Sequence, residues 1–176
     1  MVGWECLINP WEASGLDPEA VHPTYLTSVK ELSPAVASVL FGLFFAVGVV
    51  VKPVAGAAYD RIGMRGSLVS ILIPPVVGFG LLPMVENLWA LVGVTALIST
   101  MLGSGAITQS YLADSFSAEM QGTGLGVIRT ATATLGAGGP VIFGVVAEYG
   151  FFDQGYFALA AIMAVAILLT LRMPRT

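Results

Sequence analysis

Three charged side chains framed by glycines stand in the stretch GAAYDRIGMRGSL, residues 56–68. Asp60, Arg61 and Arg65 lie within six residues of each other, although only 10% of the chain is charged. A guanidinium is a planar fork of donors that suits carboxylates, and a glycine at position 63 permits a tight turn between the charges. The pattern, which begins at Gly56, predicts a polar loop with either a conformational role or the simpler role of marking a membrane surface.

Further polar residues stand inside apolar segments: Lys52, Gln109 and Arg129, with a helix-breaking Gly139-Pro140 pair. Side chains on a helix lean toward its N-terminus, so Lys52 leans away from Asp60 and reaches the nearer membrane surface poorly. Such a charge faces a cavity or a partner, or else bends back to the headgroups. Arg129 leans toward the nearer surface, which favours headgroup contact. Carbonyls freed at Pro140 could line a cavity or form a bend.

The composition fixes the environment of these residues. The chain has 176 residues, of which 56% are hydrophobic, and its mean hydropathy is +0.88. A water-soluble domain carries about a quarter of its residues as charged side chains, so the solvent here is a lipid bilayer. A hydrocarbon core of about 30 Å needs about 20 apolar residues per spanning helix. Alternating strands are absent from the sequence, which disfavours a barrel.

Five segments meet that length, and we predict an all-α membrane protein of five transmembrane helices. The predicted spans cover about residues 34–58, 67–85, 88–111, 123–147 and 155–171. Glycines in these spans favour close helix packing. Threonines and serines in the third and fourth spans are expected to bond mostly to carbonyls of their own helices.

The positive charges predict the orientation. Arg61 and Arg65 follow the first span, while Arg172 and Arg175 follow the fifth, so with five spans both clusters fall on one side. The positive-inside rule makes that side cytoplasmic, with the C-terminus inside, the N-terminus outside and the chain in the cell membrane.

The first 33 residues hold prolines and five acidic residues without an apolar run, which predicts a non-spanning N-terminal tail, with the remnant of a helix end, before the five-helix transmembrane domain of residues 34–176. The tail has no signal-peptide pattern. A single cysteine, Cys6, excludes an internal disulfide.

The sequence lacks the residue combinations that the common kinds of enzyme site require. The only histidine, His22, lies in the tail, away from any serine nucleophile in a span, and Asp60 and Asp114 stand at span ends. One histidine and one cysteine do not make a metal site, the lone GLG at 124–126 is not a phosphate loop, and no basic patch suits nucleic acid. We expect no enzyme activity, no catalytic residues, no metal and no cofactor.

The first and fourth spans resemble each other. With Pro53 aligned to Pro140 and one residue inserted, GAAYD at 56–60 pairs with GVVAE at 144–148. The two spans run in opposite directions, as in the inverted repeats of secondary transporters, although chance likeness between glycine-rich spans is an equal alternative.

The opening stretch resembles the loop signature of the major facilitator superfamily, Gly-x-x-x-Asp-Arg-x-Gly-Arg-Arg, in its Gly56, Asp60, Arg61, Gly63 and Arg65. Met64 stands where the family has another arginine. TYLTSVKELSP is similar to the end of the family's seventh helix, GSGAITQSYLADSFSAEMQGTGLG to its tenth helix and next inner loop, and GAGGPVIFGVVAEYG to its eleventh helix. The inner loop reads Glu119-Met120-Gln121-Gly122, where the family usually has Glu-x-Arg-Gly. The resemblance covers residues 24–176 as helices eight to twelve.

The resemblance implies a truncated transporter chain. Family transporters work as two six-helix halves that rock about a solute site at the bilayer midplane, and Asp60 would latch onto a helix end of the opposite half. We therefore expect secondary transport of a small solute, with a missing N-terminal half as partner. The alternative is a non-transporting membrane remnant or an assembly partner of a separate transporter half.

Overall fold

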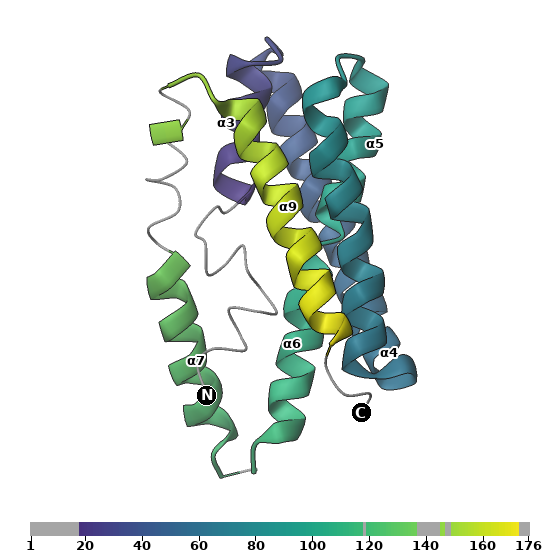
Figure 1. The fold of residues 1–176 in the computed structure, drawn as a ribbon, viewed down its shortest axis with the longest axis vertical. Coiled ribbons are helices and arrows are strands. Elements are labelled where there is room, and N and C mark those ends of the chain that lie inside the picture. The colour runs from purple at the N-terminus through teal and green to yellow at the C-terminus, as the bar shows by residue number, and fades with distance from the viewer. Residues whose placement is uncertain (1–17, 118, 137–144, 147–148, 173–176) are drawn as a thin grey trace.

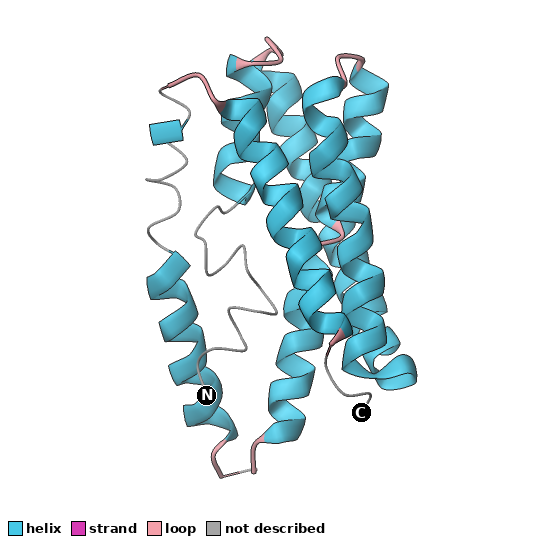
Figure 2. Cartoon of the chain, in the orientation of Figure 1, coloured by secondary structure: helices cyan, strands magenta, loops and turns pink. Residues whose placement is uncertain are grey.

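The computed structural model describes residues 18–117, 119–136, 145–146 and 149–172, and within these the secondary structure is helical (Figure 2). The helices, labelled in Figure 1, are α3 (Pro18–Ser28), α4 (Pro34–Leu81), α5 (Leu88–Ser99), α6 (Leu102–Ser115), α7 (Gln121–Gly136) and α9 (Phe152–Leu171). A 3-10 turn, η1 (Leu82–Met84), follows α4. The expected all-α membrane fold is confirmed.

Three stretches are long and apolar enough to cross a membrane: Pro34–Met84, Leu88–Ser115 and Phe152–Leu171. The first has 51 residues, which is more than twice the length that one crossing needs. Gly63 interrupts it with φ 70° and ψ 177°, so that α4 folds into a first arm, residues 34–62, and a second arm, residues 64–81. These arms correspond to the first two predicted spans and extend them by a few residues around the turn.

The two arms of α4 lie side by side and run in opposite directions. A Cβ placed on Gly103 of α6 would come within 2.6 Å of Ile71 in the second arm. The same Cβ would lie 2.8 Å from Val51 and 2.9 Å from Ala55 in the first arm. Residues before and after Gly63 therefore meet at one level of the bundle, as a hairpin requires.

The third predicted span, 88–111, is longer than expected and is broken into α5 and α6. Thr100 stands at the break, where its hydroxyl donates to the carbonyl of Leu97 at 2.8 Å and to that of Ile71 at 3.3 Å. Backbone hydrogen bonds between residues three positions apart follow: the N–H of Gly103 donates to the carbonyl of Thr100, and the N–H of Ser104 donates to that of Met101. At Thr100 the hydroxyl thus also bonds a carbonyl of the second arm of α4, which holds the break against that arm.

One end of the bundle, here named the Asp60 end, holds the turn at Gly63, the connection from α6 to α7 and the end of α9 (Figure 1, lower side). The opposite end holds the connections from α3 to α4 and from η1 to α5. Arg61 and Arg172 therefore share an end, as the count of spans predicts.

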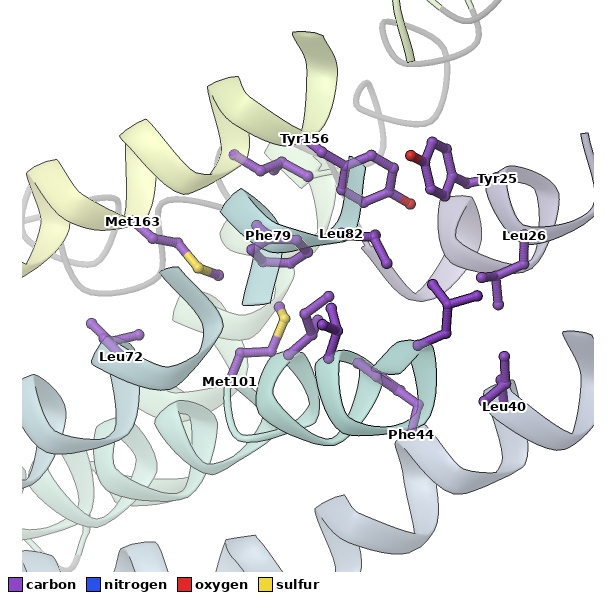
Figure 3. Close-up of a cluster of buried hydrophobic side chains, with 14 of the residues drawn as sticks. Tyr25, Leu26, Leu40, Phe44, Leu72, Phe79, Leu82, Met101, Tyr156 and Met163 are labelled. Atoms are coloured by element: carbon purple, nitrogen blue, oxygen red, sulfur yellow. The ribbon is translucent and has the colours of Figure 1, made fainter. Parts of the chain in front are cut away.

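Helix α3 lies in the segment expected to be a tail, yet it belongs to the packed bundle. Tyr25 and Leu26 are fully buried in one apolar cluster with Phe44 and Tyr156 (Figure 3). The cluster draws on α3, both arms of α4, η1, α5 and α9. With 11 residues α3 is about 16 Å long, too short to cross a bilayer, so it packs at the opposite end of the bundle without spanning.

Small residues bring the helices into contact, because lipid tails are as apolar as leucine and burial gives little driving force in a bilayer. Gly48 lies against Leu102, and Gly78 lies against Ile98. Together with Gly103, these contacts confirm the packing role that the sequence suggests, although Gly42 and Gly105 face open space among the described atoms.

Candidate functional site

Gly63 shapes the charged loop at the Asp60 end. Its φ of 70° with ψ of 177° is a backbone conformation that only glycine adopts without strain. The buried hydroxyl of Ser67 donates to the Gly63 carbonyl at 2.7 Å and so fixes the start of the second arm. The turn leaves Asp60 and Arg61 exposed on the surface of the bundle end.

Arg65 and Gly56, the other two residues of the predicted motif, are half-buried on the two arms of α4. A Cβ placed on Gly56 would meet no atom within 4 Å, so this glycine leaves open space beside the first arm. The turn thus assembles all five residues at one end of the molecule, with one carboxylate and one guanidinium turned outward.

A hydrogen bond that the sequence did not reveal links this loop to α6. Tyr59 donates from its phenol to Asp114 Oδ2 at 2.8 Å, across 55 positions of the chain. Next to it, Gln121 Nε2 at the start of α7 donates to the carbonyl of Ala113 at 2.6 Å. The ends of the first arm, α6 and α7 are therefore joined into one polar cluster beside Asp60.

Lys52, Gln109 and Arg129 are all exposed, on the first arm, α6 and α7 respectively. A lysine near the centre of a membrane helix costs about 2.5–3.5 kcal/mol on insertion scales, so Lys52 faces a cavity or a partner unless it bends back to the headgroups, whereas Arg129 leans toward the nearer surface. No described helix covers these three side chains. They remain the candidates for a solute cavity that the sequence suggested.

The hydroxyls beside them behave as the sequence predicts. Thr108 donates to the carbonyl of Ser104 at 2.9 Å, Thr130 to that of Gly126 at 2.9 Å, and Thr134 to that of Thr130 at 2.8 Å. These hydroxyls are occupied by their own helices. The polar side chains here that are left to bind a solute are therefore mainly Lys52, Arg129 and Gln109.

His22, which the sequence placed in the tail, is 2% exposed. Its Nε2 lies 3.2 Å from Thr95 Oγ1 on α5, and its ring centroid lies 6.3 Å from that of Phe44. No hydrogen-bond partner for Nδ1 exists among the residues that the structure describes. Burial lowers the pKa of this imidazole from 6.5 to about 4, so His22 is neutral at pH 7.

At the opposite end, Tyr25 ties α3 to α9. Its phenol donates to Asp153 Oδ1 at 2.7 Å, and its ring meets that of Tyr156 edge-on at 4.5 Å. Lys30 adds an ammonium 5.7 Å from the Tyr25 centroid and donates to the Pro83 carbonyl at 2.9 Å. Burial and the bond to the Asp153 carboxylate both raise the pKa of Tyr25, which keeps the phenol protonated as a donor.

Gly139 and Pro140 lie outside the described residues, so the bend or cavity predicted there is untested. Within the ranges that the structure describes, no three His, Cys, Asp or Glu side chains gather in a way that could hold a metal ion.

The loop geometry and the helical bundle together point to a membrane transport fold, and comparison with known families decides the question. Residues 19–176 match the family described as Major Facilitator Superfamily. This chain belongs to that superfamily. The matched region covers all but the first 18 residues of the 176-residue chain. A comparison with curated proteins gave no match.

Membership in the major facilitator superfamily extends the resemblance noted in the sequence. The match begins at residue 19, five positions before the stretch TYLTSVKELSP, and so includes nearly all of α3 and His22. The superfamily consists of transporters, so the chain is a membrane transport protein by family.

Proposed function

We propose that this chain forms part of a secondary transporter that moves a small solute by alternating access, with a second helical half as its partner. That half could stand on the same polypeptide or on another. The observation that carries the proposal is the Gly63 turn, which presents Asp60 and Arg61 outward at the end of a superfamily bundle. An exposed carboxylate with a neighbouring guanidinium is suited to bind a surface that the described residues do not supply.

The loop would act as a latch in one of the two conformations. Asp60 lies near the C-terminal end of the first arm, where the helix dipole disfavours an anion by about 0.3–1 kcal/mol. The N-terminus of a helix in the partner half would instead attract this carboxylate. Binding there and release would accompany the rocking of the halves, with the Tyr59–Asp114 bond keeping the loop in register with α6.

The orientation belongs to the same proposal. We place the Asp60 end, with Arg61, Arg65 and Arg172, on the cytoplasmic side of the cell membrane, because arginines concentrate in cytoplasmic loops. The Tyr25–Asp153 bond would then close the outer end of the bundle.

Reconstitution into liposomes tests the function. The 176-residue chain would be reconstituted by itself and together with a six-span half, sought first in the coding sequence immediately upstream. Uptake of a labelled monocarboxylate, phosphate, sugar and amino acid would be followed in each preparation. We expect saturable uptake of at least one solute only when both halves are present. Saturable, concentrative uptake by the chain alone would contradict the need for a partner, and its absence from both preparations would favour a non-transporting assembly protein.

A further inference from the structure

Helix α3 depends on its neighbours for its helical form. An isolated helix shorter than about 12–15 residues is marginal in water, and α3 has 11 residues with Pro23 among them. Tyr25 and Leu26 of α3 are fully buried against the rest of the bundle. By contrast, α4 also packs against α5, α6 and α9. Departure of α3 would therefore unwind this helix and leave the contacts among the longer helices in place.

Side-chain hydrogen bonds attach α3 to the bundle at two levels. Near the start of α3, His22 Nε2 lies 3.2 Å from Thr95 Oγ1 on α5. One turn later, the phenol of Tyr25 donates to Asp153 Oδ1 on α9 at 2.7 Å. The ring of Tyr25 also packs edge-on against that of Tyr156, with the ring centroids 4.5 Å apart (Figure 3). Loss of the contact at either level would weaken the docking of α3.

The position of His22 suits a neutral imidazole only. The side chain is buried, and a protonated imidazole carries two N–H donors together with a full charge. Thr95 Oγ1 can accept one bond, but Nδ1 has no acceptor within the described part of the chain. The ring also lies beside the apolar ring of Phe44. Protonation would thus bury both a charge and an unpaired donor, which is why burial lowers the pKa of His22.

The other helices beside His22 carry no charge near α3. Residues 34–51 of the first arm, residues 66–84 of the second arm and η1, and residues 88–99 of α5 contain no titratable side chain. A protonated His22 would therefore find no carboxylate on these segments to balance its charge.

The remaining titratable groups near α3 lie on α9 and in the chain beside His22 itself. On α9, Asp153 is already bonded to Tyr25, and Tyr156 lies against the same ring. After α3, the ammonium of Lys30 donates to the Pro83 carbonyl, and Glu31 is exposed. Within α3, Glu19 stands three positions before His22 in the sequence. A pH-dependent measurement has to separate His22 from these groups.

We propose that α3 is an acid-releasable strap: protonation of His22 detaches α3 from α5 and the first arm of α4, while the other helices stay packed. Thr95 and Phe44, which are buried beneath α3, become accessible when it leaves. The pH then controls access to the bundle interior from the end opposite Asp60.

Hydrogen exchange in the purified full chain tests this inference. The chain in dodecyl maltoside would be exchanged at pH 7, 6 and 5, with each rate corrected for the intrinsic pH dependence of amide exchange. Protection of the Tyr25, Leu26 and Val29 amides measures the docked fraction of α3, and the amides of residues 159–167 in α9 are the internal control. A His22 pKa of about 4 when docked, against 6.5 when released, predicts about a twentyfold loss of α3 protection between pH 7 and pH 5. Protection of α9 should not change.

Two variants assign the effect to His22. His22→Gln retains a side-chain amide that can bond to Thr95 but cannot be protonated, so α3 should keep its protection at pH 5. Glu31→Gln is the matched control, because it removes an exposed acid beside α3, and it should show the same twentyfold loss as the wild type. If α3 does not dock in His22→Gln, the wild-type pH series with its α9 control decides the question by itself.

Four results would overturn the inference. Equal α3 protection at pH 7 and pH 5 in the wild type would show that protonated His22 is tolerated, for example through a charge pair with Glu19. An equal loss of protection in α9 would mean that the whole bundle opens. A pH dependence that persists in His22→Gln would assign the effect to another group, such as Asp153, and one that disappears in Glu31→Gln would assign it to Glu31.

Discussion

Replacement of Gly63 by alanine probes the turn on which the site depends. A Cβ at φ 70° and ψ 177° meets the neighbouring backbone, and residues held in such conformations cost about 1–3 kcal/mol each. The hairpin between the arms of α4 brings Val51, Ala55 and Ile71 together at Gly103, so the strain cannot be relieved without separating these contacts. At about 1.4 kcal/mol per factor of ten, Gly63→Ala should lower the folding equilibrium constant about 5- to 150-fold.

The assay is unfolding of the purified chain in dodecyl maltoside with rising mole fractions of sodium dodecyl sulfate, followed by circular dichroism. Gly42→Ala is the matched control. Gly42 is helical, in the same arm, and a Cβ there meets nothing within 4 Å, so this change should be neutral or stabilise by up to about 1 kcal/mol. Equal unfolding midpoints for Gly63→Ala and the wild type would refute the turn as described.

Three further outcomes are expected. Gly103→Ala should destabilise by about 1–3 kcal/mol through contacts of 2.6–2.9 Å, while Gly105→Ala, which meets open space, should not; equal unfolding curves would refute the packing. The folded-state pKa of His22 lies below its ordinary value, so its contribution to stability is complete above pH 6.5 and lost as pH falls toward 4. The wild type should therefore lose up to about 1.4 kcal/mol per pH unit more than His22→Gln over that interval in thermal unfolding, and parallel pH curves would show that His22 is solvated. Cys6 should react with a membrane-impermeant maleimide in intact cells if the N-terminal end lies outside, and protection until lysis would reverse the orientation.

Local pattern in the sequence predicted the all-α membrane fold and the turn at Gly63. Long apolar runs indicate spanning helices by length alone, and the GxxxDRxG pattern places a turn at Gly63, which the structure confirms as the one break in α4 that uses a left-handed backbone. Back-bonding of Thr108, Thr130 and Thr134 was predictable for the same reason, since it depends only on residues three or four positions away.

Contacts between distant positions were not predictable. The Tyr59–Asp114 and Tyr25–Asp153 bonds join residues 55 and 128 positions apart, and no periodicity in the sequence marks them. The sequence assigns His22 to the tail because the first 33 residues hold prolines and acidic residues and lack the apolar run of a span. Its burial follows from packing against α4 and α5, which a reading of single segments does not include.

The central claim is that the exposed loop at Asp60 takes part in the transport cycle and does not only set the orientation. Its most direct test is the initial rate of solute uptake by Asp60→Asn in liposomes that contain both halves, measured at equal protein abundance. A charged hydrogen bond contributes about 1.5–3 kcal/mol, so loss of the latch should shift the inward–outward balance about tenfold or more and lower uptake accordingly, with normal insertion. Glu86→Gln, an exposed acid at the opposite end, should transport like the wild type. Unchanged kcat and KM in Asp60→Asn would contradict the claim and leave the three charges as markers of orientation.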